Sequence, residues 1–331
     1  MSRKVTAVAP SNIALIKYWG TSDLERTLPF NPSLSMTLRE CVSRTTVESI
    51  ADPKDEVLVR VAGGSLQPAS PAFSAGVRNH LDHLRSWAGV KDRFRVATEN
   101  SFPMGAGMAS SASGFAALAL AVVAALDREI SAATASVLAR ESGSGSAARS
   151  VMGGYVEWPS AGTEGAAVQV LPADHWDLRD VIAILDTTEK SVSSRAGHKL
   201  AETSPYFKPR QQQLPERLTE VRSSLQSRDF ARLAPLVEEE AIDLHLIAMS
   251  SRPPIFYWRP ATLIVLELVR AMRQGGVEVC ATMDAGANVH VICTPEAEMA
   301  VVEALDVLPE VEGVIRDGVG SGPRMIDEPL F

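Results

Sequence analysis

The 331-residue sequence has little cysteine, no excess of basic residues and no Cys-x-x-Cys pair. Its three cysteines, Cys41, Cys280 and Cys293, are widely separated, which argues against a zinc site or a disulfide framework. We expect three small buried thiols. The formal net charge of −8 argues against nucleic acid as the main partner, because phosphate backbones bind basic surfaces. A local pocket can still bind a small phosphate, so anionic substrates remain open.

The sequence also lacks an apolar run that could cross a membrane. The longest such run, residues 115–126, is too short for a span and predicts a core helix. The N-terminus has no long apolar segment of the signal-peptide kind, so we expect a cytoplasmic protein. The six histidines show no metal-ligand spacing, which leaves no protein-built metal site to predict. We expect His80 and His83 to lie on a helix surface.

Strand-like and helical patterns occur in both halves of the chain, which predicts an α+β protein with two domains. In the first half, β-branched residues alternate in several segments, and residues 75–89 have helical spacing. In the second half, a buried strand at 180–188 precedes a long charged helical run at 214–251. Tandem prolines end this run, because proline does not continue a helix. We place the domains at residues 1–178 and 179–331.

Two stretches of small residues are candidate anion sites. The first, "PMGAGMASSASG" at 103–114, leads directly into the apolar helix, whose N-terminus offers free N–H donors and a positive dipole end. It lacks the Walker A pattern, so it is not a P-loop of that type. The second, "GSGSAAR" at 143–149, ends in Arg149, which can grip a carboxylate or a phosphate with two hydrogen bonds. A tightly packed turn and a flexible linker are the respective alternatives.

Three further features are weak when taken singly. Asp284 stands in "DAG" between two predicted strands, where an aspartate most often only forms the turn. Lys17 follows the apolar residues 13–16, and such a lysine is commonly a surface residue. The stretch "KSVSSRAG" at 190–197 offers serines and an arginine to a phosphate, but a solvated loop explains it as well.

Together and in this order, the motifs resemble the mevalonate diphosphate decarboxylase group of the GHMP kinase superfamily. The resemblance rests on six stretches between residues 8 and 325: "APSNIALIKYWG", "NPSLSMTL", "ENSFPMGAGMASSASGFAALA", "GSGSAARSVMGGYVEW", "HLIAMSSRPPIFYW" and "MDAGANVHVI". It implies the two-domain GHMP kinase fold with the active site in the interdomain cleft. It also implies use of ATP and Mg²⁺ to phosphorylate a tertiary 3-hydroxyl, followed by decarboxylation to an isopentenyl product.

The resemblance also implies roles for individual residues. Asp284 would face the 3-hydroxyl, Arg149 would bind the substrate carboxylate, and Lys17 would sit beside both. The residues around the 5-phosphate end of the substrate would be Tyr18, Ser144, Gly145, Ser146, Ser194 and Arg195. The residues around the ATP phosphates would be Gly105, Gly107, Met108, Ala109, Ser110 and Ser111. A phosphorylated mevalonate is the implied partner, with neither nucleic acid nor membrane, and homodimers are common in the family.

One departure from the family pattern bears on the substrate. Members that use the diphosphate typically read "KYWGKRD", whereas this chain reads "KYWGTSD" and has the neutral Thr21 and Ser22 there. Loss of a cation beside the distal phosphate favours mevalonate 5-phosphate, giving isopentenyl phosphate, with the diphosphate reaction as the alternative. A 3-kinase without decarboxylation is a further alternative, although such kinases lack the Asp/Lys pair that this chain keeps. A catalytically inactive small-molecule sensor would bind ATP and make no ADP.

Overall fold

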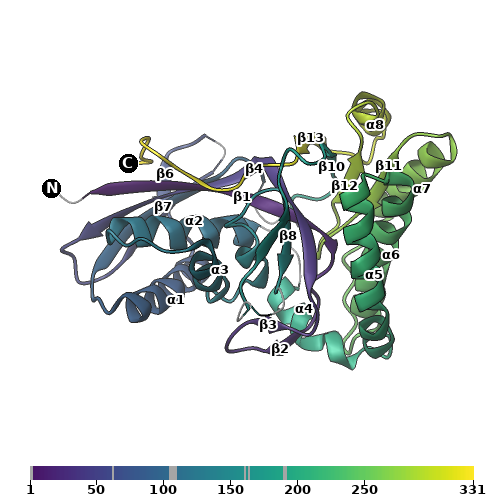
Figure 1. The fold of residues 1–331 in the computed structure, drawn as a ribbon. Helices are drawn as coiled ribbons and strands as arrows, with labels where there is room; N and C mark the ends of the chain where they lie inside the picture. The colour runs from purple at the N-terminus through teal and green to yellow at the C-terminus, as the bar shows by residue number, and fades with distance from the viewer. Residues whose placement is uncertain (1–2, 62, 104–109, 160–161, 163–164, 189–191) are drawn as a thin grey trace.

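The computed structural model describes residues 3–61, 63–103, 110–159, 162, 165–188 and 192–331. Two sheets with their helices lie end to end, the first from the N-terminal half and the second from the C-terminal half (Figure 1). This is the mixed α and β architecture that the sequence predicts. Both termini lie at the same end of the molecule, beside the first sheet (Figure 1).

The larger sheet has the strand order β14-β1-β4-β7-β5-β6, and β8 pairs with both β4 and β9. Pairing is antiparallel except between β5 and β7. A short β2–β3 hairpin stands apart. The bounds are β1 Lys4–Ile16, β2 Thr21–Asp23, β3 Leu28–Pro29, β4 Ser33–Ile50, β5 Glu56–Arg60, β6 Leu66–Pro68, β7 Arg93–Asn100, β8 Tyr155–Trp158, β9 Val168–Leu171 and β14 Arg324–Ile326.

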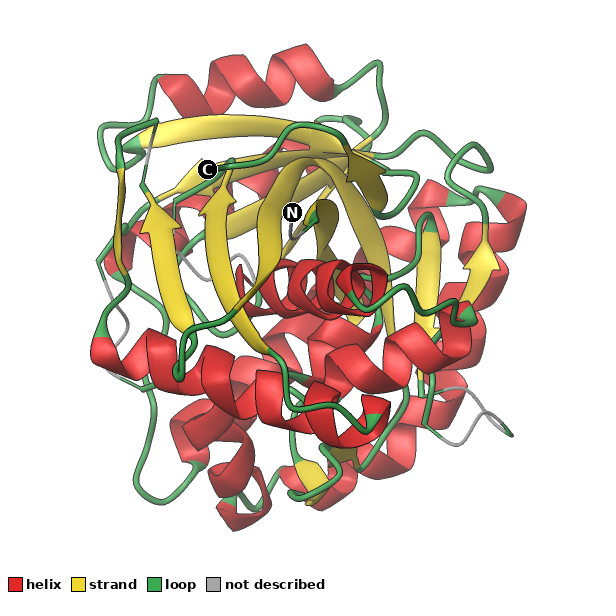
Figure 2. Ribbon diagram, turned by 90° about the vertical axis from the view of Figure 1, so that its left-hand side faces the viewer, coloured by secondary structure: helices red, strands yellow, loops and turns green. Residues whose placement is uncertain are grey.

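Helices α1 (Pro71–Ala88), α2 (Ser110–Ala125) and α3 (Ala132–Arg140) accompany this sheet, followed by the 3₁₀ helix η1 (Gly145–Ala148). Figure 2 shows the strands arching beside the helices. The predicted apolar helix is α2, which packs on β1 and β4 on one side and on α1 and α3 on another. A helix enclosed in this way is apolar around its whole circumference. Its first turn, at Ser110, opens toward the second half of the molecule.

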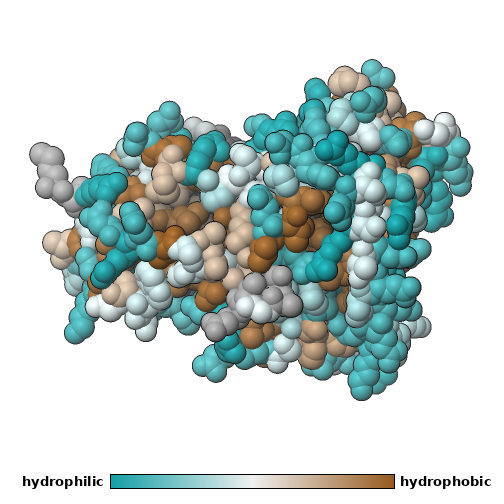
Figure 3. Space-filling view, viewed as in Figure 1, coloured by the Kyte–Doolittle hydropathy of each residue, from teal (hydrophilic) through white to brown (hydrophobic). Residues whose placement is uncertain are grey.

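The smaller sheet has the order β11-β12-β10-β13, with antiparallel pairing throughout. Its strands are β10 Arg179–Ile184, β11 Val279–Thr282, β12 Val289–Cys293 and β13 Gly313–Gly318. The helices of this half are α4 Ser194–Leu200, η2 Ala201–Thr203, α5 Phe207–Ser227, α6 Phe230–Ser250, α7 Pro260–Gln274 and α8 Glu298–Asp306. Figure 3 shows a mainly hydrophilic outer surface over the helices on its right-hand side.

The single helical run predicted over 214–251 is wrong, because the chain reverses inside it. Arg228 ends α5 in the left-handed conformation with φ 57°, and the Asp229 side chain caps α6 by accepting the Arg232 N–H. Both residues lie in a polar stretch that helical periodicity does not distinguish from a helix surface. The predicted stop is confirmed, since α6 ends at Ser250, just before the tandem prolines.

The end of the chain returns to the first sheet. Strand β14 pairs with β1, and the Leu330 N–H donates to Thr46 Oγ1. The sheets change between β9 and β10, which is where we place the domain boundary at 178. The last residues of the chain join the first sheet, although they fall within the predicted second domain. The division into residues 1–178 and 179–331 therefore stays a prediction.

The core explains how the two halves are held together. One apolar cluster contains Ile13 and Leu34 of the first sheet, Ile182 of the second, and Leu218 and Val221 of α5. Burying each large apolar side chain contributes about 1.5–3 kcal/mol. The two halves therefore share one apolar core.

Several predictions from the sequence concern residues in the interior. All three cysteines are buried and free, and burial raises the pKa of the Cys293 thiol to about 12. The expectation for His80 is wrong: its ring is buried between α1 and α2, and Nε2 lies 2.9 Å from the Leu138 carbonyl. Helical spacing alone did not show that this face of α1 turns inward. Across the described ranges, we find no helix with the length and apolar character of a membrane span.

Candidate active site

A cavity of about 370 Å³ opens where the two halves meet. Its walls come from the end of β1, the β2–β3 hairpin, the start of α2, the 142–149 segment, the start of α4 and the turn after β11. The predicted site residues among its lining are Lys17, Tyr18, Ser110, Ser111, Ser144, Gly145, Ser146, Arg149, Ser194, Arg195 and Asp284. Gly105, Gly107, Met108 and Ala109 lie outside the described residues.

Lys17 and Asp284 form an ion pair across this cavity wall. Lys17 Nζ lies 3.0 Å from Asp284 Oδ1 and also donates to the Ala14 carbonyl at 2.7 Å. The lysine side chain is 1% exposed, whereas the carboxylate side chain is 23% exposed. The buried strand β1 ends at Ile16, so it delivers the lysine directly to the carboxylate.

The charges of this pair are set by their surroundings. Burial lowers the pKa of Lys17, while the adjacent Asp284 carboxylate opposes that shift. Burial by itself would raise the pKa of Asp284, but Lys17, His290 and Arg149 together bring it below its ordinary value. The carboxylate is therefore ionised at neutral pH, and it accepts hydrogen bonds there without donating one.

Arg149 lies beside the pair and is held by two buried polar groups of the first half. Its Nε donates to Asn12 Oδ1 at 3.1 Å, and its Nη1 donates to Ser33 Oγ. Burial lowers its pKa to about 10, and the Asp284 charge acts in the opposite direction. The guanidinium is thus a fixed cation facing the cavity, oriented by β1 and β4.

The two stretches of small residues meet at the cavity. Ser111 Oγ, in the first turn of α2, lies 3.3 Å from Ser144 Oγ. Gly145 is required by close packing, because a Cβ at this position would lie 2.6 Å from both Trp158 and Tyr18. The serine hydroxyls and the N-terminus of α2 therefore face one space, which suits an anion carrying several oxygens.

The opposite end of the cavity is aromatic. The Tyr18 ring stacks on His198 with centroids 4.0 Å apart and packs edge-on against Trp158. Its hydroxyl lies 2.8 Å from Thr21 Oγ1. His198 Nδ1 accepts the Gly20 N–H at 3.0 Å, which fixes the turn that follows the lysine. Thr21 thus provides the hydrogen-bond partner of the Tyr18 hydroxyl. A cationic side chain at the same position would extend into the cavity.

Arg195 brings a positive charge to this end from the second half. It lies in the first turn of α4, whose N-cap is Ser193. Its guanidinium packs against Gly143, where an added Cβ would lie 3.1 Å from Arg195 Cζ. Gly143 also has φ +86°, a left-handed conformation that glycine adopts without strain. The stretch at 190–197, for which a solvated loop was one of two interpretations, begins a helix at Ser194 within the described residues.

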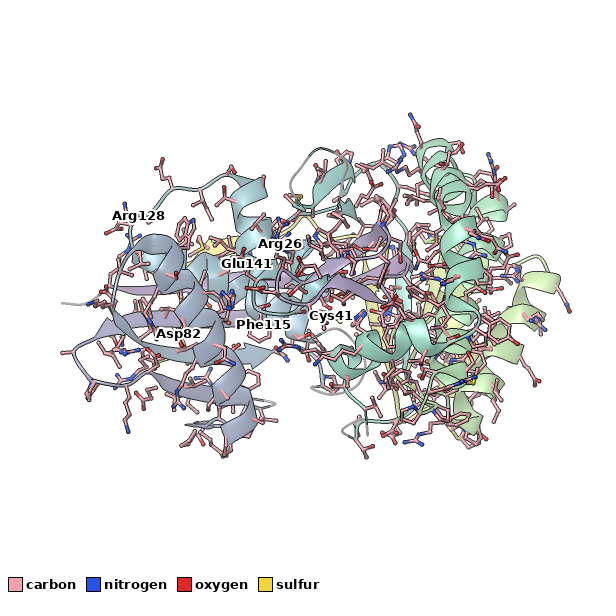
Figure 4. All side chains as sticks on the ribbon, turned by 90° about the horizontal axis from the view of Figure 1, so that it is seen from below. Arg26, Cys41, Asp82, Phe115, Arg128 and Glu141 are labelled. Atoms are coloured by element: carbon pink, nitrogen blue, oxygen red, sulfur yellow. The ribbon has the colours of Figure 1, made fainter. Side chains whose placement is uncertain are left out.

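A second, mainly apolar cavity of about 280 Å³ adjoins the first. It lies among α1, α2 and β7, and it shares Gly76, Ser110, Ser111 and Phe115 with the main cavity. Figure 4 shows Phe115 toward the middle of the molecule, with Asp82 and Arg128 further out along the first half. An apolar slot beside an anion-binding helix end is a suitable place for the flat base of a nucleotide.

Sequence patterns missed several residues that complete the site. His198 and Trp19 line the cavity, and Glu240 and His245 of α6 stand behind the ion pair. Burial lowers the pKa of His245 to about 3, so its ring is neutral beside the backbone of Asp284. A histidine or glutamate in a helical segment carries no local signal for such a position. Arg210 and Arg217, seven residues apart on α5, are the only hint, because this spacing places both on one helix face.

Comparisons with known proteins identify the family. The model of the diphosphomevalonate decarboxylase-like N-terminal domain matches residues 9–168, and that of the mevalonate 5-diphosphate decarboxylase C-terminal domain matches residues 180–314. The chain is 34% identical to a diphosphomevalonate decarboxylase of Ganoderma lucidum, over 93% of this chain and 83% of the relative.

Solved structures give the same result. The mevalonate diphosphate decarboxylase of Staphylococcus aureus superposes with a TM-score of 0.90 at 31% identity, covering 99% of each chain. A structure described as MDDEF in complex with MVAPP, AMPPCP and magnesium has a TM-score of 0.89 at 34% identity, covering 99% of this chain and all of that one. The chain therefore belongs to the mevalonate diphosphate decarboxylase family, with its two-domain GHMP kinase-type fold.

Proposed function

We propose that this chain is an ATP-dependent decarboxylase of mevalonate 5-diphosphate that forms isopentenyl diphosphate. The observation that carries the proposal is the ionised Asp284, paired with Lys17, influenced by the nearby Arg149 charge and lining a cavity that serine hydroxyls also line. The relatives support the diphosphate, since their names specify it. This fits the alternative of the sequence analysis better than its first expectation, the monophosphate.

The nucleotide would lie across the two adjoining cavities. Its base would occupy the apolar slot among α1, α2 and β7, and its phosphates would meet Ser110 and Ser111 at the helix N-terminus. Positions 105, 107, 108 and 109, which precede α2 in the sequence, keep their predicted role at the phosphates. The γ-phosphate would then point toward the Lys17–Asp284 pair, since both cavities share the two serines.

In the first step, the 3-hydroxyl oxygen attacks the γ-phosphorus and the bond to ADP breaks. Asp284 would accept the hydrogen bond of that hydroxyl and orient its lone pair. As the bond to phosphorus forms, the hydroxyl becomes acidic, and its proton would pass to Asp284 and from there to solvent. A carboxylate with a lowered pKa is a weak base, so orientation is its larger contribution. Lys17 would hold the carboxylate in place and offset charge on the transferring oxygens.

In the second step, the bond between C3 and the phosphorylated oxygen breaks and phosphate departs. The electron pair of the bond between the carboxyl carbon and C2 becomes the double bond between C2 and C3, and carbon dioxide leaves. Arg149 would bind the substrate carboxylate and align that bond with the departing phosphate. Its anchoring by Asn12 and Ser33 keeps this alignment fixed during both steps.

Mg²⁺ fits this site as a companion of the nucleotide. Among the described residues no group of three acidic, histidine or cysteine side chains could hold a metal. Magnesium typically uses one or two protein oxygens together with phosphates and waters. The hydroxyls of Ser110 and Ser111 are suitable protein ligands at the phosphate position. When bound, the ion would neutralise charge on the β- and γ-phosphate oxygens.

The 5-phosphate end of the substrate would lie toward the aromatic end of the cavity. Arg195 supplies the positive charge there, and the polar groups around it belong to Tyr18, Ser144, Gly145, Ser146 and Ser194. The guanidinium stacked against Gly143 is placed to bind a phosphate with two hydrogen bonds. This cation is what supports binding of a diphosphate despite the neutral Thr21.

The monophosphate remains a second candidate substrate because of one specific observation. Thr21 lines the cavity with its hydroxyl bonded to Tyr18, at the position where diphosphate-using members typically have lysine. A site with one cation fewer loses more affinity for the more highly charged ligand. Purified protein should therefore be given mevalonate, its 5-phosphate and its 5-diphosphate in turn with MgATP, and kcat/KM compared. Higher kcat/KM for the monophosphate would overturn the substrate proposed here.

Two further expectations accompany this function. We retain a cytoplasmic location and a homodimer as proposals, the second because dimers are common in the family. Size-exclusion chromatography with light scattering at several concentrations measures the oligomeric state directly. A constant monomer mass would contradict the homodimer.

A further inference from the structure

The backbone of Lys17 is held by side chains from both halves of the molecule. Its N–H donates to Glu240 Oε1 of α6 at 2.9 Å. Its carbonyl accepts from Arg210 Nη2 of α5 at 2.9 Å and from Asn31 Nδ2 at 3.0 Å. Lys17 follows the last residue of β1, so the sheet ladder does not supply these partners. Helices of the second half therefore fix a backbone position of the first.

We call Glu240 and Arg210, which bind the Lys17 backbone, the clamp. Both belong to a buried ionic network. Glu240 is fully buried and receives Arg210 on one oxygen and Arg217 on the other, with Arg217 Nη1 at 2.6 Å. Arg217 also reaches Asp243 at 2.6 Å. A buried carboxylate needs such partners to remain charged. Glu240 is not among the described residues that line the cavity, so it acts on substrate only through Lys17.

The position of the clamp has a geometric consequence. The lysine side chain is held at its far end by the Ala14 carbonyl and by Asp284, and at its near end by the clamp. Release of the near end lets the ammonium shift relative to the carboxylate. A displacement of about 1 Å at reacting groups can lower a rate about a hundredfold.

We propose that Glu240 and Arg210 are positioning residues for the reaction, which hold the Lys17 ammonium in register with Asp284 by fixing the lysine backbone. This rests on the function proposed above for the Lys17–Asp284 pair. Neither residue is among the described residues that line the two cavities. Their effect therefore falls on turnover, with little change in the binding of either ligand.

The electrostatics support the geometry. The charged and titratable groups around Lys17 come from β10, α5, α6, the segment after η1 and the turn after β11: Asp180, Arg210, Glu240, His245, Arg149 and Asp284. Burial lowers the pKa of Lys17, and Glu240 is the second carboxylate, after Asp284, that opposes this. Removal of the Glu240 charge therefore lowers the pKa of Lys17 further.

The test compares Glu240→Gln with Glu216→Gln, an exposed glutamate of α5. Glu240→Gln should lower kcat about 10- to 100-fold while the KM values for ATP and substrate change less than about threefold. The alkaline decline of kcat (its alkaline limb) should move to lower pH in Glu240→Gln, and Glu216→Gln should behave as the parent. Glu240→Asp, which keeps the charge, should restore the alkaline limb. Unchanged kcat and an unchanged limb in folded Glu240→Gln would overturn the proposal, as would loss of thermal stability alone.

Arg210→Lys provides a second variant if Glu240→Gln does not fold. It keeps the charge beside Glu240 but loses the guanidinium fork that reaches the Lys17 carbonyl, so kcat should fall with little shift of the alkaline limb. Unchanged kcat in this variant would overturn the role of Arg210.

An activity-independent measurement separates this inference from the proposed function. With ¹³C-labelled lysine, the Lys17 signal, assigned by its absence in Lys17→Met, should titrate at lower pH in Glu240→Gln than in the parent. If the parent makes no carbon dioxide from either phosphorylated mevalonate, the proposed function fails, and this titration still tests the link between Glu240 and Lys17. If the parent is active but the titration does not move, the inference fails alone.

Discussion

The two ends of the cavity are built in opposite ways. At one end, Lys17 is buried, and its polar groups have partners within the protein: Ala14, Asp284, Glu240, Arg210 and Asn31. At the other end, Thr21 belongs to a short hairpin and the exposed Arg195 to the first turn of a short helix. The Lys17 end holds its charges in fixed positions. At the Thr21 end, only a few side chains determine which ligand charge fits.

This difference separates catalysis from selectivity. Buried, mutually bonded groups are costly to change and act equally on any substrate whose reacting carbon reaches them. The hairpin and the start of α4 can accept substitutions without disturbing the core. We therefore expect changes at the Lys17 end to lower turnover of both phosphorylated mevalonates alike. Changes at the Thr21 end should alter their ratio.

Asp284→Asn should have the largest effect. It removes the negative charge that we propose faces the 3-hydroxyl, and it removes the anion paired with the Lys17 ammonium, so kcat should fall about 10²- to 10⁴-fold with both substrates. Release of carbon dioxide and of ADP should be measured together. Asp306→Asn, at the end of α8, is the control and should keep parental rates. Retained activity in Asp284→Asn, or loss with one substrate only, would contradict the account.

Arg149→Lys should have the next largest effect. The ammonium keeps the positive charge but loses the fork that bonds Asn12 and Ser33, and it loses bidentate contact with a carboxylate. One charged hydrogen bond is worth about 1.5–3 kcal/mol, so kcat/KM should fall about 10- to 100-fold for both substrates. Steady-state kinetics measures this, with the exposed Arg128→Lys as the matched control. Parental kcat/KM in Arg149→Lys would exclude a bidentate role.

Thr21→Lys should change selectivity more than rate. A lysine at this position would add a second cation to the end that holds Arg195, and the ratio of kcat/KM for diphosphate over monophosphate should rise about tenfold. Ser22→Lys is the matched control, because Ser22 Oγ bonds the Leu28 and Pro29 carbonyls and its side chain is outside the cavity lining. An equal change in both variants, or none in Thr21→Lys, would remove Thr21 as a determinant of the substrate.

The pH dependence should show the smallest effect. Activity requires protonated Lys17, whose pKa burial lowers from its ordinary value of 10.5, so kcat should decline on the alkaline side at a pH below that value. The pKa of Asp284 is lowered from 3.8, so this carboxylate stays ionised down to more acidic pH than that. The pH profile of Lys17→Arg measures the assignment, because arginine does not titrate in this range. The same alkaline limb in Lys17→Arg would assign it to another group.

Much of the fold was predictable from local patterns. The apolar run became α2, the alternating segments became strands, and the tandem prolines marked the end of α6. The break at Arg228 and the inward face of His80 were not predictable, because each depends on tertiary packing that periodicity does not contain.

The residues that line the candidate site were predictable from the sequence, whereas the residues that position them were not. Every predicted site residue within the described ranges lines one cavity, because those residues carry motifs with a recognisable chemical composition. Glu240 and Arg210 were missed, since a buried ion network between helices leaves no mark in the sequence beyond ordinary charged residues. Groups that touch the ligand can be found from motifs, whereas groups that position them require the structure.

The most direct test measures ADP and carbon dioxide in the same reaction of the parent protein with MgATP and mevalonate 5-diphosphate. We predict one carbon dioxide for each ADP throughout the time course. ADP without carbon dioxide would show a kinase that stops at the 3-phosphate, and would contradict the role assigned to the Lys17–Asp284–Arg149 cluster.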